Sequence, residues 1–166
     1  MNTEELRNLQ RPLKDKYRTE PESALVVHKA RGTVGPNISF FISSKQGTVA
    51  VGLHPAAGGN GHISCSGDLL LESLIGCAGV TLGSVSTAMG ITIRKGVIRA
   101  EGELDYRGTM AVTKDIPVGF RSIRLIFELE TDADAEKIQK MIQLTERYCV
   151  VYQTIAAATE ITSLII

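Results

Sequence analysis

The segment from Asp68 to Met89 constrains the fold more than any other part of the chain, because it predicts one long helix without a polar side. At 100° per residue its side chains separate into stripes, two of which are apolar or small. The first stripe holds Leu71, Ile75, Ala78, Leu82, Val85 and Met89, and the second holds Leu70, Leu74, Cys77, Thr81 and Ala88. We therefore expect this helix to be buried on all sides, at the centre of the protein.

A third stripe of the same helix carries Gly76, Gly79 and Gly83. Glycine costs about 0.8–1.0 kcal/mol relative to alanine in a helix interior, so three on one stripe indicate that another backbone approaches closely. A second copy of the same helix, related by a two-fold axis, would satisfy this stripe. Basic and acidic residues number 18 each, and the resulting net charge of zero also favours self-association.

Short strands are expected before and after this helix. Residues 24–30, 37–43 and 48–53 predict a meander of three strands, separated by turn signals at Gly32, at Gly35-Pro36 and at Gln46-Gly47. Ser66 or Asp68 is expected to cap the start of the helix, and Gly90 to end it.

The second half of the chain also mixes both kinds of element. Residues 91–109 return to β character, and residues 120–130 alternate apolar with polar side chains, which predicts a strand with one buried face. A second helix is expected from Thr131-Asp132 and continues or restarts at residues 148–152, and residues 159–166 predict a last strand. The side chains expected to face inward from this second helix are Ile138, Met141, Ile142 and Thr145.

The composition excludes several classes of protein. A chain of balanced charge has no electrostatic reason to bind nucleic acid or an anionic membrane. No apolar run is expected to reach the roughly 20 residues that span a bilayer, and residues 1–10 lack an apolar signal segment. We therefore expect a cytoplasmic protein, with an amphipathic arm over residues 1–22 and a single domain over residues 23–166. Leu6, Leu9, Leu13 and Tyr17 form the apolar stripe of the arm.

Two cysteine-containing motifs resemble those of one known family. The run from Ser66 to Gly79, SGDLLLESLIGCAG, resembles the central helix of OsmC/Ohr proteins, the osmotically inducible and organic hydroperoxide resistance family. Glu146-Arg147-Tyr148-Cys149 resembles the second family motif, and its cysteine follows Cys77 by 72 residues. The order of elements agrees over residues 24–166. The resemblance implies an α+β fold in which antiparallel sheets surround a long buried helix, and an intertwined homodimer.

The resemblance also implies a reaction. In active members the first cysteine attacks a hydroperoxide, the second resolves the product, and an external dithiol, of lipoyl type in this family, restores both thiols without a cofactor or metal. Cys77 and Cys149 match these two positions, and Arg31 matches the family arginine by its order along the chain. The family glutamate, about ten residues before the reactive cysteine, is replaced by Gly67, so Asp68 is the expected substitute.

Two further departures concern residues near these motifs. The family commonly has proline after its second cysteine, where this chain has Val150. Glu72 lies nearer to Cys77 in sequence than Asp68 does, but it lies about 140° away from Cys77 around an ideal helix.

Thiol chemistry of this kind has definite requirements. The thiolate is the nucleophile, so hydrogen bonds or a positive charge must lower the cysteine pKa from its free value near 8.5. The sulfenic acid that forms condenses with a nearby thiol, and an external dithiol reduces the disulfide. The apolar character of both helices favours an organic hydroperoxide over hydrogen peroxide.

Other interpretations remain open. Cys77 could be a small core residue, in a dimer that binds a small apolar ligand instead of reducing peroxide. The same cysteines could also serve a thiol reductase or sulfur carrier with another substrate. Cys65 has no family counterpart. A zinc site that combines any of the three cysteines with His54 or His62 matches no known ligand spacing.

Overall fold

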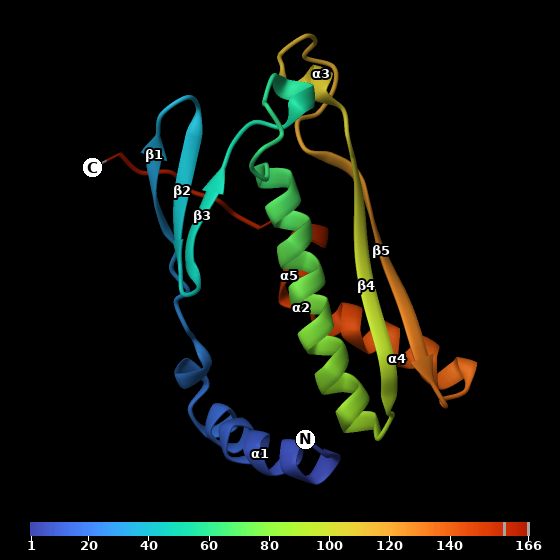
Figure 1. Cartoon of the computed structure of the whole chain (residues 1–166). Helices are drawn as coiled ribbons and strands as arrows, with labels where there is room; N and C mark the ends of the chain where they lie inside the picture. Colours follow the sequence, from blue (N-terminus) through green and yellow to red (C-terminus); the bar gives the residue numbers. More distant parts are fainter. Residues whose placement is uncertain (158, 166) are drawn as a thin grey trace. The chain divides into compact units, whose positions relative to one another are not determined.

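The computed structural model in Figure 1 describes residues 1–157 and 159–165. Two compact units divide the chain. Unit 1 comprises Met1–Glu20, Ser73–Arg99 and Leu125–Ile166, and unit 2 comprises Pro21–Glu72 and Ala100–Arg124. The elements in chain order are α1 (Thr3–Thr19), η1 (Pro21–Ala24), β1 (Arg31–Gly35), β2 (Ser39–Ser44), β3 (Gly47–Val51), η2 (Pro55–Ala57), α2 (Ser66–Met89), β4 (Ile93–Leu104), α3 (Tyr106–Thr109), β5 (Phe120–Thr131), α4 (Ala135–Tyr148) and α5 (Val150–Ala156).

The predicted meander forms the sheet of unit 2. Strands β1, β2 and β3 pair antiparallel in that order, with Arg31 opposite Ser43 and Phe40 opposite Val51. The expected position of the first strand is wrong, because residues 25–30 have no regular structure and β1 begins at Arg31. Gly32 is a strand residue and not a turn, since a Cβ added there would lie 2.2 Å from Cε1 of Phe40. The glycine leaves room for the aromatic ring.

The core of unit 1 is built from α2, α4 and the strands β4 and β5. Leu82 and Val85 of α2 are buried against Met141 of α4. Phe127 and Leu129 of β5 pack on this cluster, as the alternation along residues 120–130 predicts, while Glu128 and Glu130 are exposed. The other partly buried residues around the cluster are Met89, Ile91, Ile93, Ile98, Ile142 and Leu144.

Helix α2 is buried along one side only. Leu74, Ala78, Leu82, Val85 and Ser86 are buried, whereas Ser73, Gly76, Val80 and Gly83 are exposed, and Val80 exposes 79% of its surface. The prediction of a helix buried on all sides is therefore wrong for the single chain. A Cβ added at Gly76 or Gly83 would have no atom within 4 Å, so no described residue closely approaches these two glycines. Gly79, the third glycine of the predicted stripe, is half-buried, and a Cβ added there would lie 3.8 Å from Cδ1 of Ile98. We call the exposed residues Ser73, Gly76, Val80 and Gly83 the glycine stripe.

The length of α2 corrects a second expectation. By length and composition alone, this helix of 24 residues could cross a membrane, so the expectation that no apolar run approaches that length is wrong. The central helix of a soluble protein has the same length and composition, so this property does not identify a membrane span.

The helix ends follow from local hydrogen bonds. Asp68 stabilises the start of α2 from within the first turn, because its Oδ2 accepts from the backbone N–H of Cys65 at 3.0 Å. The predicted cap at Ser66 or Asp68 is therefore displaced, since α2 begins at Ser66 and Cys65 precedes it. Gly90 follows the last turn of α2 with a φ of 67°, in the left-handed region that glycine adopts without strain. Helix α4 begins at Ala135, later than expected from Thr131-Asp132, because Asp134 is its cap and accepts from the N–H of Lys137 at 2.8 Å.

The expected last strand is absent from residues 159–165, which have no regular structure, while residue 166 lies outside the described residues. Ile161, Leu164 and Ile165 are almost fully exposed. A strand needs a hydrogen-bonding partner, and none of the described strands pairs with these residues.

Candidate active site

The two predicted cysteines come together in unit 1. Cys77 lies in the middle of α2, and Cys149 is the residue at which α4 ends and α5 begins. Met141 and Thr145 are fully buried on one side of α4, and Cys149, which follows Thr145 by one turn, is fully buried as well. The N–H of Cys149 donates to the carbonyl of Thr145 at 2.9 Å, and the extended backbone of Cys149 then breaks the helix.

Cys77 is only half-buried, and its surroundings favour the thiolate. Burial raises the pKa of the Cys77 thiol, but hydrogen bonds outweigh this effect, so the pKa is lowered below its usual value. The groups that lower the pKa are the backbone N–H of Val151, the thiol of Cys149 and the backbone N–H of Val150. The smallest contribution comes from the hydroxyl of Thr81, which donates to the carbonyl of Cys77 at 2.8 Å. All four groups are neutral. The sequence does not reveal this set, since it depends on the helix break at Cys149.

Cys149 has the opposite tendency. Burial raises the pKa of the Cys149 thiol, and the hydrogen bond to Cys77 and the negative charge of its thiolate raise it further. The N–H of Tyr152 donates to Sγ of Cys149 at 3.5 Å and only partly offsets these effects. These opposed directions favour the proton on Cys149 over the proton on Cys77. Both thiols are free, so the arrangement can form a thiolate at Cys77 beside a protonated partner.

This difference predicts the pH dependence of thiol alkylation. The rate at Cys77 should reach half of its maximum at a lower pH than the rate at Cys149, because only the thiolate reacts. In Cys149→Ala the Cys77 midpoint should rise, since one donor to the thiolate is lost. Peptide-resolved mass spectrometry after iodoacetamide treatment measures both rates. Cys65→Ala is the matched control and should leave the Cys77 midpoint unchanged; an unchanged midpoint in Cys149→Ala would contradict the assigned hydrogen bond.

The other two predicted site residues belong to unit 2. Arg31 begins β1 and is exposed, and none of the described carboxylates forms an ion pair with it. Asp68 lies in the first turn of α2, and the N–H of Cys65 holds the pKa of this carboxyl below its usual value, with smaller contributions from the Cys65 thiol and from His54. The Asp68 carboxylate is therefore already engaged in a hydrogen bond that stabilises the first turn of α2.

Sequence reasoning missed a cavity of about 340 Å³ in unit 2. Cys65, Asp68, His54, Tyr106 and Phe120 are among the residues that line it. The rings of His54 and Tyr106 stack with centroids 5.0 Å apart. No aromatic or histidine motif in the sequence indicates this contact, because the two residues are far apart along the chain. Within residues 1–157 and 159–165 no group of three His, Cys, Asp or Glu side chains could hold a metal.

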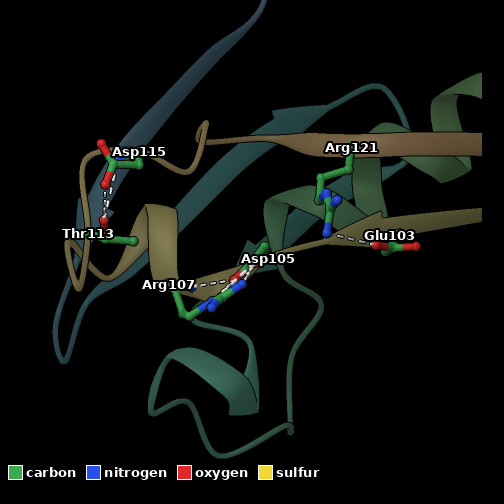
Figure 2. A network of polar contacts seen from close by, with 6 residues as sticks. All are labelled: Glu103, Asp105, Arg107, Thr113, Asp115 and Arg121. Atoms are coloured by element: carbon green, nitrogen blue, oxygen red, sulfur yellow. Dashed lines mark hydrogen bonds and ion pairs between the residues drawn. The ribbon is translucent and has the colours of Figure 1, made fainter.

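Several polar contacts surround α3, the short helix that begins at Tyr106. Asp105 caps α3, and hydrogen bonds from Arg107 hold the pKa of the Asp105 carboxyl at about 2. Figure 2 shows this pair beside the contacts of Arg121 with Glu103 and of Thr113 with Asp115. On β5, Arg121 and Arg124 form ion pairs with Glu103 at 3.4 Å and with Glu101 at 2.7 Å.

Comparisons with known proteins agree with this fold. The family described as "OsmC-like protein" matches residues 59–163. An OsmC-like protein from Mycoplasma pneumoniae has a similar structure, with a TM-score of 0.67 and 20% identity over 79% of this chain and 88% of its own. The organic hydroperoxide resistance protein OhrB of Bacillus subtilis gives a TM-score of 0.54 and 21% identity, over 77% of this chain and 90% of its own.

A protein from Legionella pneumophila, described as an organic hydroperoxide resistance protein OsmC, gives a TM-score of 0.63 and 12% identity, over 79% of this chain and 91% of its own. At these identities the similarity concerns the fold. No curated protein matches the chain.

Proposed function

Because this chain belongs to the OsmC-like protein family, we propose that it reduces organic hydroperoxides through the thiols of Cys77 and Cys149. The observation that carries the proposal is the opposed acidity of the two contacting thiols. The Cys77 pKa is lowered and the Cys149 pKa is raised, which is the arrangement that an attacking thiolate and a resolving thiol require.

The reaction has three balanced steps. The Cys77 thiolate bonds to the distal oxygen of the hydroperoxide, the O–O bond breaks, and the alkoxide leaves as an alcohol after taking up a proton. Cys149 then attacks the sulfenic acid on Cys77, and water leaves as the disulfide forms. An external dithiol, which we expect to be of lipoyl type, reduces this disulfide and is itself oxidised. Such a cycle requires a reducing compartment, so we place the protein in the cytoplasm.

Thiol counting tests this cycle directly. After one equivalent of an alkyl hydroperoxide, the wild-type protein should lose two free thiols and keep one, since the chain has three cysteines. Intact mass should fall by two hydrogens as the disulfide forms. A protein that keeps all three thiols over several minutes would refute the proposed function.

Arg31 and Asp68 are the further residues that we propose for the reaction, on the family resemblance. All groups that hydrogen-bond to the Cys77 thiol are neutral, so the thiolate and the departing oxygen still need a positive partner. Arg31→Ala should lower the rate of peroxide reduction by about 10- to 100-fold, and Arg31→Lys should restore part of it. Arg121→Ala is the control, because Arg121 forms an ion pair with Glu103. Equal rates in Arg31→Ala and Arg121→Ala would remove Arg31 from the reaction.

We further propose that the working protein is a homodimer in which the glycine stripe of α2 contacts its symmetry mate. In the single chain this stripe is exposed, and glycines in a helix interior have a cost that close helix packing would offset. The exposed apolar residues at 159–165 would also gain a partner strand from a second copy.

The substrate preference follows from apolar side chains near the thiols in sequence. Tyr148 and Val150, which flank Cys149, are both largely exposed. An apolar surface at the entrance favours an alkyl group over water, so an alkyl hydroperoxide should be consumed faster than hydrogen peroxide, by about tenfold in kcat/KM. Stopped-flow measurement of both substrates gives the ratio. A faster reaction with hydrogen peroxide would reverse this assignment.

A second candidate function is a binding dimer without peroxidase activity. The absence of the family glutamate, replaced by Gly67, favours it, as does an open cavity of about 680 Å³ in unit 1. Gly79, Gly83 and Ile98 are among its lining residues. Native mass spectrometry would show a bound apolar molecule, together with no loss of thiols on peroxide treatment. If instead the thiols react rapidly with a disulfide and slowly with peroxide, the protein is a thiol reductase.

A further inference from the structure

Helix α1 is the element that the proposed function leaves unexplained. It lies outside residues 59–163, which match the family, and none of its residues is buried. It is nevertheless a well-formed helix. Asn2 and Glu5 make a complete capping box, with hydrogen bonds of 2.9 and 2.8 Å, and the Thr3 hydroxyl donates to the carbonyl of Thr87 in α2 at 2.7 Å. Pro12 lies inside the helix and does not end it.

The apolar side chains of α1 lie together on one side. At 100° per residue, Leu6, Leu9, Leu13 and Tyr17 fall within an arc of about 80°. Leu9 exposes 60% of its surface, Leu13 50% and Tyr17 40%. Leu6 is half-buried, so it is the exposed part of the stripe, at Leu9, Leu13 and Tyr17, that needs a partner outside the single chain.

Basic residues border this stripe on both sides. On the same projection Lys14 and Arg7 lie along one border, and Lys16 lies on the other, beside Glu5. The side opposite the stripe carries both signs, and its Arg18 and Asp15 form an ion pair. Long basic side chains at such a border can cover apolar contacts with their methylene groups and extend their charges toward a negatively charged surface. The whole chain has no net charge, but α1 has five basic and three acidic residues and therefore a formal charge of +2.

We infer that α1 binds the surface of a phospholipid bilayer that contains anionic lipid. A capped helix with a narrow apolar stripe, bordered by basic residues, lies in the interface plane with its apolar side in the acyl boundary. The basic residues then interact with anionic headgroups. This inference does not depend on the thiol chemistry of Cys77 and Cys149.

A second copy of the chain fits the observations less well, whether α1 contacts its α1 or its β4–β5 ribbon. Pairing of α1 with a second α1 would form a coiled coil of only about two heptads, shorter than the three to four that the pattern requires. A second copy also offers no free row of acidic groups on its β4–β5 ribbon, since the carboxylates there already have basic partners. The ion pairs are Arg124–Glu101, Arg121–Glu103, Arg99–Glu128 and Lys95–Glu130.

The test is co-sedimentation of the full-length protein with vesicles. Wild type should bind vesicles of phosphatidylcholine with about one-third phosphatidylglycerol, and bind vesicles of phosphatidylcholine alone at least about tenfold more weakly. Lys14→Glu and Leu9→Glu should each weaken binding to the anionic vesicles by roughly tenfold or more. Lys45→Glu makes the same charge change in the exposed turn before Gly47 and should have little effect.

Two results would overturn the inference. One is wild-type protein that stays in solution with both kinds of vesicle, or that binds both equally. The other is a change of mass in light scattering of Leu9→Glu without lipid, which would show that a second copy covers the apolar stripe. Circular dichroism of each variant checks that the helices remain formed, and these substitutions replace exposed side chains.

Discussion

Replacement of Cys77 by serine should lower the rate of hydroperoxide reduction by about a thousandfold or more. Serine keeps the size of the side chain, but its hydroxyl stays protonated at neutral pH and is a poor nucleophile toward an O–O bond. The donors around Cys77 that favour a thiolate, among them the N–H of Val151, cannot make the hydroxyl ionise. Peroxide consumption with excess dithiol, measured for wild type and variant at equal concentration, gives the ratio.

Two further cysteine variants assign the roles of the thiols. Cys149→Ser should react with the first equivalent of peroxide as fast as wild type, but a sulfenic acid should persist on Cys77 and be trapped by dimedone. Cys65→Ser makes the same chemical change in unit 2 and should keep the full cycle. Undiminished peroxide reduction by Cys77→Ser would rule out Cys77 as the attacking thiol. If Cys77→Ser also reacted rapidly with the first equivalent of peroxide and Cys149→Ser did not, Cys149 would be the attacking thiol and Cys77 the resolving thiol.

The elements that the sequence predicts well are those whose own periodicity determines their burial. Helix α2 extends from Ser66 to Met89, close to its predicted bounds, and the alternation along β5 places Phe127 and Leu129 in the core. Glu128 and Glu130 on the other face form ion pairs with Arg99 and Lys95 across the β4–β5 ribbon. Local pattern and tertiary packing agree in these segments, which is why the prediction succeeds.

The errors occur where burial depends on a distant or missing neighbour. Gly32 has the local signature of a turn, but it lies inside β1 because the ring of Phe40 passes over it. The apolar residues 161, 164 and 165 predict a strand that no described element pairs with. The division into an arm over residues 1–22 and one domain over residues 23–166 stays a prediction.

The sequence singles out the two thiols of the candidate site but not their electrostatics, and the roles of Arg31 and Asp68 stay predictions. The motifs around Cys77 and Cys149 identify the two thiols by resemblance. The different acidity of the thiols depends on the break between α4 and α5, which turns the N–H groups of Val150 and Val151 toward Cys77. No spacing in the sequence indicates which of two neighbouring thiols will keep the proton.

Replacement of Gly83 by leucine should separate the stability of the chain from its assembly. A Cβ at Gly83 meets no atom within 4 Å in the single chain, and leucine is the better helix former by roughly 0.5–1 kcal/mol. The isolated chain should therefore fold at least as stably as wild type. If the glycine stripe contacts a second α2, two leucines must enter a space that has no room for side chains. The dissociation constant of the dimer should then rise by roughly a hundredfold or more.

Sedimentation equilibrium measures this constant, and urea unfolding measures the stability of the chain. Gln139→Leu is the matched control, because it introduces the same side chain at an exposed position of α4 and should leave the dimer intact. A Gly83→Leu protein that remains dimeric at low concentration would exclude α2 from the interface. A Gly83→Leu protein that unfolds at lower urea as a monomer would show that this part of α2 packs within its own chain, and the exposed glycines would then need another explanation. The two-fold contact is supported only if the Gly83→Leu protein is a folded monomer. That result alone shows that a second copy of α2 occupies the space over Gly83.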